Sequence, residues 1–170
     1  MSATTTSAKK RVAVERTVVI SSQPFDRVVA AIDAGVAHPD MQQFVRDVAS
    51  SKTDADVERV VAEATGSLDL MEMARFNLGE VLRKNSGTGS KRILRVLIGN
   101  PLVMKRMVEH VPAAGSYAPV TVLIDERPDG VHLSYDTMAS YLAPYGNPKA
   151  LEIARDLDEK IANLLANAAA

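Results

Sequence analysis

The sequence predicts an α+β fold, in which helices pack against a mixed, mostly antiparallel sheet. Segments rich in β-branched residues, typical of strands, alternate with segments whose apolar residues recur at the helical spacing. Two β-rich segments, 117–126 and 131–136, are separated by the turn residues of 127–130, a pattern typical of a hairpin. With 170 residues, 46% of them hydrophobic, the chain is long enough to fold around one core without a disulfide or a metal.

The first ten residues are small and polar and show no periodicity, so we expect a disordered tail over 1–10 and a single domain over 11–170. Residues 11–21 are rich in β-branched side chains and predict a strand. Ser22 or Gln23 can cap the helix that Pro24 opens. Its core stripe has helical spacing and consists of Phe25, Val28, Val29, Ile32 and Val36.

An added helical segment is predicted at about 38–65. Gly35 and the His38-Pro39 step end the first helix, and apolar residues from Met41 to Val48 then repeat the helical spacing. Thr53 and Asp56 resemble a capping box, which predicts the start of a third helix that ends before Gly66.

Residues 68–76 are apolar on both alternating faces, as in a strand that is covered on both sides, although periodicity alone leaves a helix open. Residues 85–90 predict a loop and residues 93–98 a strand. Asn100 fits an N-cap and Pro101 the first helical position, so a helix is expected to run to about residue 110.

After the hairpin, residues 140–147 predict a loop. Asn147 and Pro148 repeat the cap-plus-proline signal and open a long amphipathic helix that runs to the C-terminus. The expected order is therefore one strand, three helices, two strands, a helix, two strands and a helix, which is typical of an α+β domain.

Composition excludes several classes of protein. The formal net charge of −1 and the pI near 6.3 argue against a nucleic-acid-binding protein that works by bulk electrostatics. Cysteine is absent, which excludes thiol catalysis and Cys-ligated metal centres. No apolar run reaches the roughly 18 residues of a membrane span. We therefore expect a soluble cytoplasmic protein that does not bind membranes.

Charge is unevenly distributed along the chain. Residues 81–108 hold seven basic and no acidic side chains, namely Arg83, Lys84, Lys91, Arg92, Arg95, Lys105 and Arg106. One interpretation is that these are solvated side chains whose charges meet acids elsewhere in the fold. The other is an anion-binding wall, in which the helix that starts at Asn100 would hold the anion at its N-terminus.

The motifs assign no catalytic residue, no cofactor and no metal. The glycines of 87–91 resemble a phosphate loop only superficially, and no GxSxG or SxxK pattern occurs. The three histidines stand in separate elements without an i,i+4 partner, which predicts no metal site. The pair Tyr135-Asp136 ends a strand opposite a loop with two more tyrosines. It can bind a polar ligand, act as an acid or base, or cap the following turn.

Several motifs together resemble the family named domain of unknown function 302. They are Arg95-Val-Leu-Ile-Gly-Asn-Pro-Leu-Val-Met, Val111-Pro, Tyr117-Ala-Pro-Val-Thr-Val-Leu, Asp129-Gly-Val-His-Leu-Ser-Tyr-Asp, Tyr145-Gly-Asn and Ala154-Arg-Asp-Leu-Asp. The resemblance covers about 68–166, while 11–36 matches the family's opening strand and helix. It implies a compact α+β domain with an antiparallel-rich sheet, often a homodimer, with no established activity.

Two departures from the family pattern argue against any redox, metal or acid–base role that depends on those two positions. Gly99 stands where many relatives have cysteine, and Asn77-Leu-Gly stands where others have Asp-His-Gly. The polar positions that the chain shares with the family imply a ligand site, to which we add Arg95 from the basic segment. The candidate ligand-binding residues are Arg95, Asn100, Tyr117, Tyr135 and Asp136.

The resulting hypothesis is a homodimeric domain that binds a small polar or anionic ligand. Surplus apolar residues in 68–73 and 41–48 would lie at the dimer interface. The alternative is a protein–protein interaction or scaffold module that uses segment 38–65, and an enzyme of unknown reaction ranks third.

Overall fold

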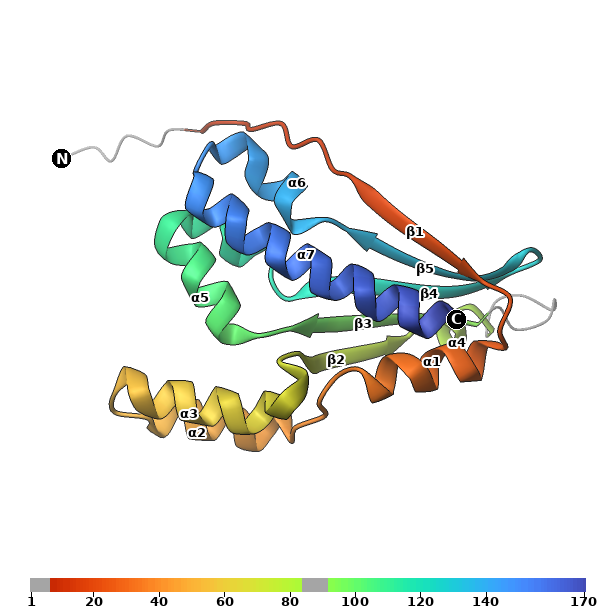
Figure 1. The fold of residues 1–170 in the computed structure, drawn as a ribbon, viewed down its shortest axis with the longest axis horizontal. Coiled ribbons are helices and arrows are strands. Elements are labelled where there is room, and N and C mark those ends of the chain that lie inside the picture. Colours follow the sequence, from red (N-terminus) through yellow and green to blue (C-terminus); the bar gives the residue numbers. More distant parts are fainter. Residues whose placement is uncertain (1–6, 84–91) are drawn as a thin grey trace.

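The computed structural model describes residues 7–83 and 92–170, which form one sheet covered by helices on one face (Figure 1). The predicted tail at 1–6 and the predicted loop at 85–90 lie outside the described residues. Residues 7–10 are exposed and belong to no helix or strand. None of the described helices has the length and apolar character that crossing a membrane requires.

The sheet has five strands in the order β1-β5-β4-β3-β2, and each neighbouring pair is antiparallel. The fold class is therefore confirmed. The strands are β1 (Arg16–Ser21), β2 (Met71–Asn77), β3 (Ile93–Gly99), β4 (Val120–Arg127) and β5 (Gly130–Asp136). A single isolated bridge between Ala37 and Met71 supplies a parallel pairing.

The predicted helices are present, together with two short ones that the sequence did not indicate. They are α1 (Phe25–Ala34), α2 (Met41–Ser50), α3 (Asp54–Thr65), α4 (Leu78–Arg83), α5 (Pro101–His110), α6 (Met138–Leu142) and α7 (Pro148–Ala169). Helix α7 crosses one face of the sheet, with α1 and α5 beside it, while α2 and α3 form a hairpin beyond β2 (Figure 1).

The core lies between α7 and the sheet. Along β4, Val120, Val122 and Ile124 are buried against the helices, while Thr121 and Leu123 point to the other face and are only half-buried. The helices α1, α5 and α7 all lie on the first face, and we call the second face the open face (Figure 1). Alternation along the strands therefore presents a row of side chains from four strands to this face.

Local capping signals proved accurate. The side chains of Asn100 and Asn147 each accept a hydrogen bond from the first turn of their helix, and Thr53 and Asp56 form the predicted capping box. The first helix differs, because Pro24 itself is the N-cap residue. The Gln23 side chain instead donates to the Ala170 carbonyl oxygen, which fastens the C-terminal end of α7.

Four predicted boundaries were wrong, one of them at β4, which begins at Val120 instead of residue 117. Strand β1 begins at Arg16 instead of residue 11, because its partner β5 ends at Asp136 opposite Arg16. Strand β2 begins at Met71 and is not covered on both sides, because its exposure rises along its length and Phe76 near its end is 47% exposed. The predicted loop at 140–147 holds part of α6 and a turn of 3₁₀ helix at Ala143–Tyr145.

Candidate functional site

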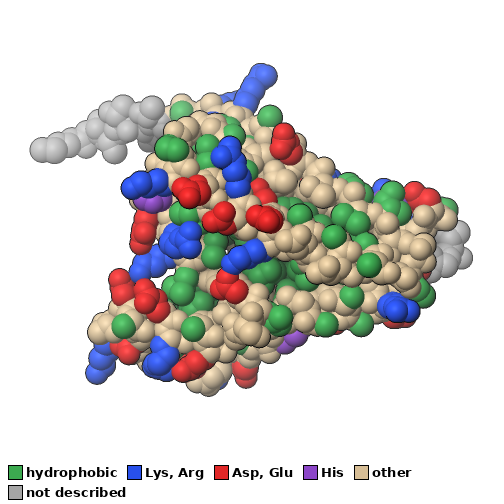
Figure 2. All heavy atoms as spheres, in the orientation of Figure 1, with side chains coloured by type: hydrophobic (Ala, Val, Ile, Leu, Met, Phe, Trp, Pro, Cys, Tyr) green, Lys and Arg blue, Asp and Glu red, His purple; other side chains and the backbone are tan. Residues whose placement is uncertain are grey.

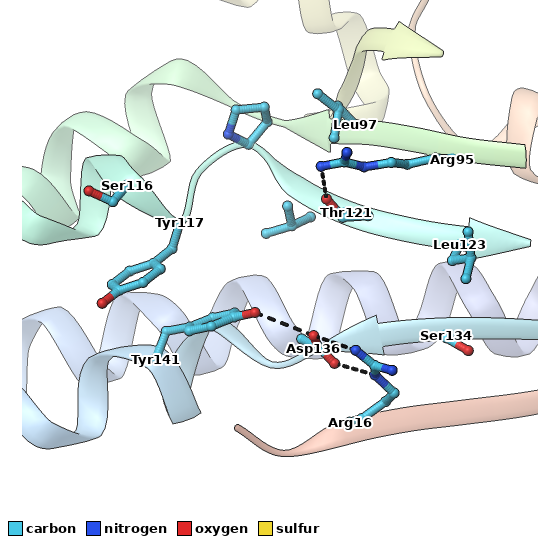
Figure 3. Close-up of a pocket in the computed structure, with 12 residues that line it drawn as sticks. Arg16, Arg95, Leu97, Ser116, Tyr117, Thr121, Leu123, Ser134, Asp136 and Tyr141 are labelled. Carbon is cyan, nitrogen blue, oxygen red and sulfur yellow. Dashed lines mark hydrogen bonds and ion pairs between the residues drawn. The ribbon is translucent and has the colours of Figure 1, made fainter. Parts of the chain in front are cut away.

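A cavity of about 570 Å³ opens on the open face of the sheet (Figure 3). It is built from alternating residues of β1, β5, β4 and β3, closed at one end by the segments before β4 and after β5. Its lining consists of Arg16, Arg95, Leu97, Ser116, Tyr117, Pro119, Val120, Thr121, Leu123, Ser134, Asp136 and Tyr141. The cavity is therefore lined by two guanidiniums, one carboxylate, several hydroxyls and aliphatic side chains.

Arg16 and Asp136 form a two-fold hydrogen-bonded ion pair at one side of the cavity (Figure 3). Arg16 Nε donates to Asp136 Oδ1 at 2.6 Å, and Nη2 donates to Oδ2 at 2.8 Å. The Tyr141 hydroxyl also donates to Oδ2 at 3.3 Å. The hydrogen bond from Arg16 holds the pKa of the Asp136 carboxyl below its ordinary value. Asp136 is therefore a fixed anion, and its charge is balanced by Arg16.

Arg95 is the second cation of the cavity. Its Nη2 donates a long hydrogen bond of 3.5 Å to Thr121 Oγ1, and its guanidinium carbon lies 6.0 Å from the centre of the Phe76 ring. Within the described part of the chain, no carboxylate forms an ion pair with Arg95. Its positive charge is thus available to a ligand, whereas that of Arg16 is already paired.

Tyrosines form the wall between the sheet and α6. The rings of Tyr117 and Tyr141 are stacked, with centroids 4.6 Å apart and planes 12° from parallel. The hydroxyls of Tyr117 and Tyr145 share a hydrogen bond of 2.9 Å, which raises the pKa of Tyr117. Burial, followed by the Asp136 charge, raises the pKa of Tyr141. Both phenols of the stacked pair are therefore neutral at physiological pH and provide hydroxyls.

Of the five residues proposed from the sequence, the structure brings Arg95, Tyr117 and Asp136 together around this cavity. Tyr135 lies on the other face of the sheet, because neighbouring residues of a strand point to opposite sides. Its side chain is buried in the core, and its hydroxyl donates to Asp158 Oδ1 of α7. Burial and the Asp158 charge raise the pKa of Tyr135 far above its ordinary value.

Asp158 also accepts hydrogen bonds from the first two N–H groups of α6. Met138 N donates to Oδ1 at 2.7 Å and Ala139 N donates to Oδ2 at 2.9 Å. This carboxylate of α7 therefore ties β5, α6 and α7 together. Tyr135 belongs to that tie and does not line the cavity.

Asn100 is also remote from the cavity. Its Oδ1 accepts from Leu102 N at 2.8 Å, and its Nδ2 donates to Asp69 Oδ1 at 2.7 Å. The Asp69 carboxylate, which also pairs with Lys160, thus lies beside the start of α5. A negative side chain at this place disfavours the anion that we expected at the N-terminus of this helix.

The basic segment 81–108 does not form one wall. Arg92 pairs with Asp26 of α1, and Lys105 pairs with Asp54 of α3 at 3.2 Å. Figure 2 shows basic and acidic side chains interleaved over the helices on the face in view. For Arg92 and Lys105, the structure therefore agrees with the interpretation that basic side chains of this segment pair with acids elsewhere in the fold. Arg95 lies apart from them, on the open face.

Sequence reasoning did not assign Arg16, Thr121, Ser134 and Tyr141 to the site. Thr121 and Ser134 share one signal, alternation, since each stands two residues from another lining residue of its strand, Leu123 and Asp136. That signal becomes useful only when the register is known: Arg16 lies opposite Asp136, at a separation of 120 residues.

Comparison with known proteins agrees with this fold. The family model described as "Domain of unknown function DUF302" matches residues 46–168. The crystal structure of an uncharacterized conserved protein DUF302 from Bacillus stearothermophilus is similar, with a TM-score of 0.64 at 12% sequence identity. The likeness covers 90% of this chain and 97% of that chain. No match is found among curated proteins. At 12% identity, the likeness to the solved structure shows the fold alone. The family match begins at residue 46 and so includes α3, which we expected in an added segment.

Proposed function

The chain belongs to the DUF302 family, and from the geometry of its open face we propose that it binds a small organic anion in the cavity there. One observation carries the proposal: Arg95 is a cation in a cavity without a carboxylate partner in the described part of the chain. A planar guanidinium forms paired hydrogen bonds with a carboxylate or a phosphate. The neighbouring Arg16 is held by Asp136, so Arg95 is the group that receives the ligand's negative charge.

The rest of the lining supports a ligand with an apolar body. Leu97 and Leu123 add aliphatic side chains to the open face of the lining, and Thr121 and Ser134 add hydroxyls. The volume of about 570 Å³ falls within the range of about 300–1,000 Å³ of small-molecule sites. Arg16 and Asp136 neutralise one another, so the lining carries one uncompensated positive charge, that of Arg95. A monoanion with a hydrophobic part and a hydroxyl or carbonyl group fits this arrangement.

Replacing Arg95 with alanine is expected to weaken binding of such an anion at least tenfold, because a hydrogen bond to a charged group contributes about 1.5–3 kcal/mol. A panel of aromatic and aliphatic carboxylates and organic phosphates would first be screened on the wild-type protein by thermal shift. Isothermal titration calorimetry would then measure the dissociation constant of the best probe. Arg106→Ala is the matched control, since Arg106 comes from the same basic segment but lies outside the cavity.

The proposal predicts unchanged binding in Arg106→Ala and an unchanged melting temperature in Arg95→Ala, whose side chain is exposed. Equal losses in both variants would indicate nonspecific attraction of anions to basic side chains and would contradict the assigned site. Failure of every probe to shift the wild-type protein would also count against it.

The open face supports a second part of the proposal, a homodimer in which another copy covers this face. Val18 and Ile20 on β1 are 46% and 53% exposed, and Phe76 on β2 is 47% exposed. Leu70 and Met71, which we expected at an interface, are instead buried within the chain. Apolar side chains at both edges of one uncovered sheet face favour burial by a two-fold copy.

Light scattering at micromolar concentration is expected to give twice the chain mass of 18.3 kDa. Ile20→Lys should reduce the mass to that of one chain, because it places a charge in the proposed contact. Val45→Lys is the control, since Val45 of α2 is 60% exposed but lies on the helical hairpin. A wild-type mass near 18.3 kDa at all concentrations would contradict the dimer. Dissociation by Val45→Lys alone would place the interface on the hairpin.

A further inference from the structure

Asp33, His38 and Glu72 form a cluster away from the open-face cavity. Asp33 stands in the last turn of α1, His38 follows that helix, and Glu72 stands on the edge strand β2. One ligand atom from each, an imidazole nitrogen and two carboxylate oxygens, lies within 4.8 Å of the other two. None of the three lines the cavity described above. The fold thus joins residues that the sequence analysis kept apart.

Backbone pairing fixes the distance between His38 and Glu72. The Ala37 N–H donates to the Leu70 carbonyl oxygen at 2.8 Å, and the Glu72 N–H donates to the Ala37 carbonyl oxygen at 2.9 Å. These bonds form the isolated parallel bridge beside β2. The residue after Ala37 is therefore held next to Glu72 by the main chain, without relying on its own side chain.

The hydrogen bonding of His38 determines which ring nitrogen carries the proton. His38 Nε2 lies 3.0 Å from the Asp33 carbonyl oxygen, which can only accept, so Nε2 is the donor. The lone pair of the neutral ring is then on Nδ1, and Nδ1 faces Glu72 Oε2 at 3.8 Å. Two acceptors face one another across this gap. Metal-binding histidines are commonly oriented in this way, with the second ring N–H donated to a backbone carbonyl.

Arg75 is the remaining charged group of the cluster. It donates to both carboxylates: Nε lies 2.9 Å from Glu72 Oε1, and Nη2 is bonded to Glu72 Oε2 and to Asp33 Oδ1. Its Nη1 also lies 3.5 Å from Asp33 Oδ2. A carboxylate has about four lone-pair sites, so these bonds leave acceptors on each group. Two carboxylates and one guanidinium leave one uncompensated negative charge when His38 is neutral. Arg75 also restrains the two carboxylates, as outer hydrogen-bond partners of metal ligands do.

We propose that Asp33, His38 and Glu72 bind a divalent ion of the zinc class, through His38 Nδ1 and one oxygen from each acid. Zinc combines imidazole and carboxylate ligands at about 2.0–2.2 Å, with water completing a tetrahedral shell. Such bonds place ligand atoms roughly 3.4 Å apart, and small rotations of the exposed His38 and the half-buried Asp33 and Glu72 side chains would bring the cluster to that geometry. The ion would fasten the start of the α2–α3 hairpin to the sheet edge.

Titration of the metal-free chain with ZnCl₂ in a calorimeter tests the proposal, with CoCl₂ absorption as a second readout of coordination by nitrogen and oxygen. We expect one ion per chain and a rise of the melting temperature with zinc. His38→Gln and Glu72→Gln should each weaken binding at least tenfold, while retaining the melting temperature of the metal-free protein. His110→Ala is the control for zinc on an exposed histidine of α5, and it should bind as the wild type does.

The proposal is overturned if zinc does not bind, or if His38→Gln and Glu72→Gln bind as tightly as the wild type. It is also overturned if His110→Ala causes the larger loss, since the ion would then be held at an unrelated surface histidine. Circular dichroism of each variant shows that a loss of binding does not come from unfolding.

Discussion

Replacing Asp158 with alanine is expected to lower the free energy of unfolding by about 3 kcal/mol, because buried donors lose their acceptor. The carboxylate accepts from the Tyr135 hydroxyl and from the N–H groups of Met138 and Ala139. After the substitution, the hydroxyl of Tyr135 stays in the core, where its side chain is buried. Urea denaturation followed by circular dichroism would measure the difference.

Two further variants separate this carboxylate from a general effect on α7. Asp156 stands two residues earlier and is exposed, so Asp156→Ala is expected to change stability by less than about 0.5 kcal/mol. Tyr135→Phe removes one donor but leaves the two N–H groups bonded to Asp158, and should cost about 1 kcal/mol. An Asp158→Ala variant as stable as Asp156→Ala would refute the structural role assigned to this group.

The same carboxylate explains why α6 was predicted as a loop. Helices with their own cap, such as those that begin after Thr53, Asn100 and Asn147, carry their start signal within four residues and were found from the sequence. Thr137 precedes α6 but makes no side-chain cap. The acceptor for the first turn comes from Asp158, about 20 residues further along the chain. Local patterns do not contain that contact.

The candidate site was partly predictable for a similar reason. Alternation along a strand is a property of the sequence, and it already places Tyr135 and Asp136 on opposite faces. Which of the two faces is open depends on where α7 packs. The partner of Asp136 depends on the pairing of β1 with β5, which sets Arg16 opposite it. The tyrosines and the carboxylate indicated a polar ligand from the sequence. The pairing register of the strands decides which of these residues line the cavity.

The position of Arg95 on β3 also explains why it is separated from the other basic residues of 81–108. Arg92 directly precedes β3 and lies three residues before Arg95, so the two side chains point to opposite faces of the sheet. Arg92 reaches Asp26 of α1 on the helical side, while Arg95 lies beside Thr121 on the open side. Because side chains alternate between the two faces of the sheet, Arg92 forms a structural ion pair on one face, while Arg95 is an unpaired cation on the other.

Gly130 is the second position at which a small change should have a large effect. It starts β5 with a φ of +137°, a conformation that side chains with a Cβ rarely adopt. A Cβ built there would lie 2.6 Å from the Ser21 carbonyl oxygen and 3.1 Å from Ile20 Cγ2. Gly130→Ala is therefore expected to cost about 3 kcal/mol, from backbone strain together with displacement of β1.

Gly146→Ala is the matched control for the strain alone. Gly146 also has a positive φ, of +64°, but nothing lies within 4 Å of a Cβ built on it. Its substitution should cost about 1 kcal/mol, the penalty of the left-handed conformation for an L-residue. Hydrogen exchange would distinguish the two variants further, because displacing Ser21 should expose the amides of β1 only in Gly130→Ala. If Gly130→Ala is no less stable than Gly146→Ala, the contact of the hairpin with β1 does not constrain this turn.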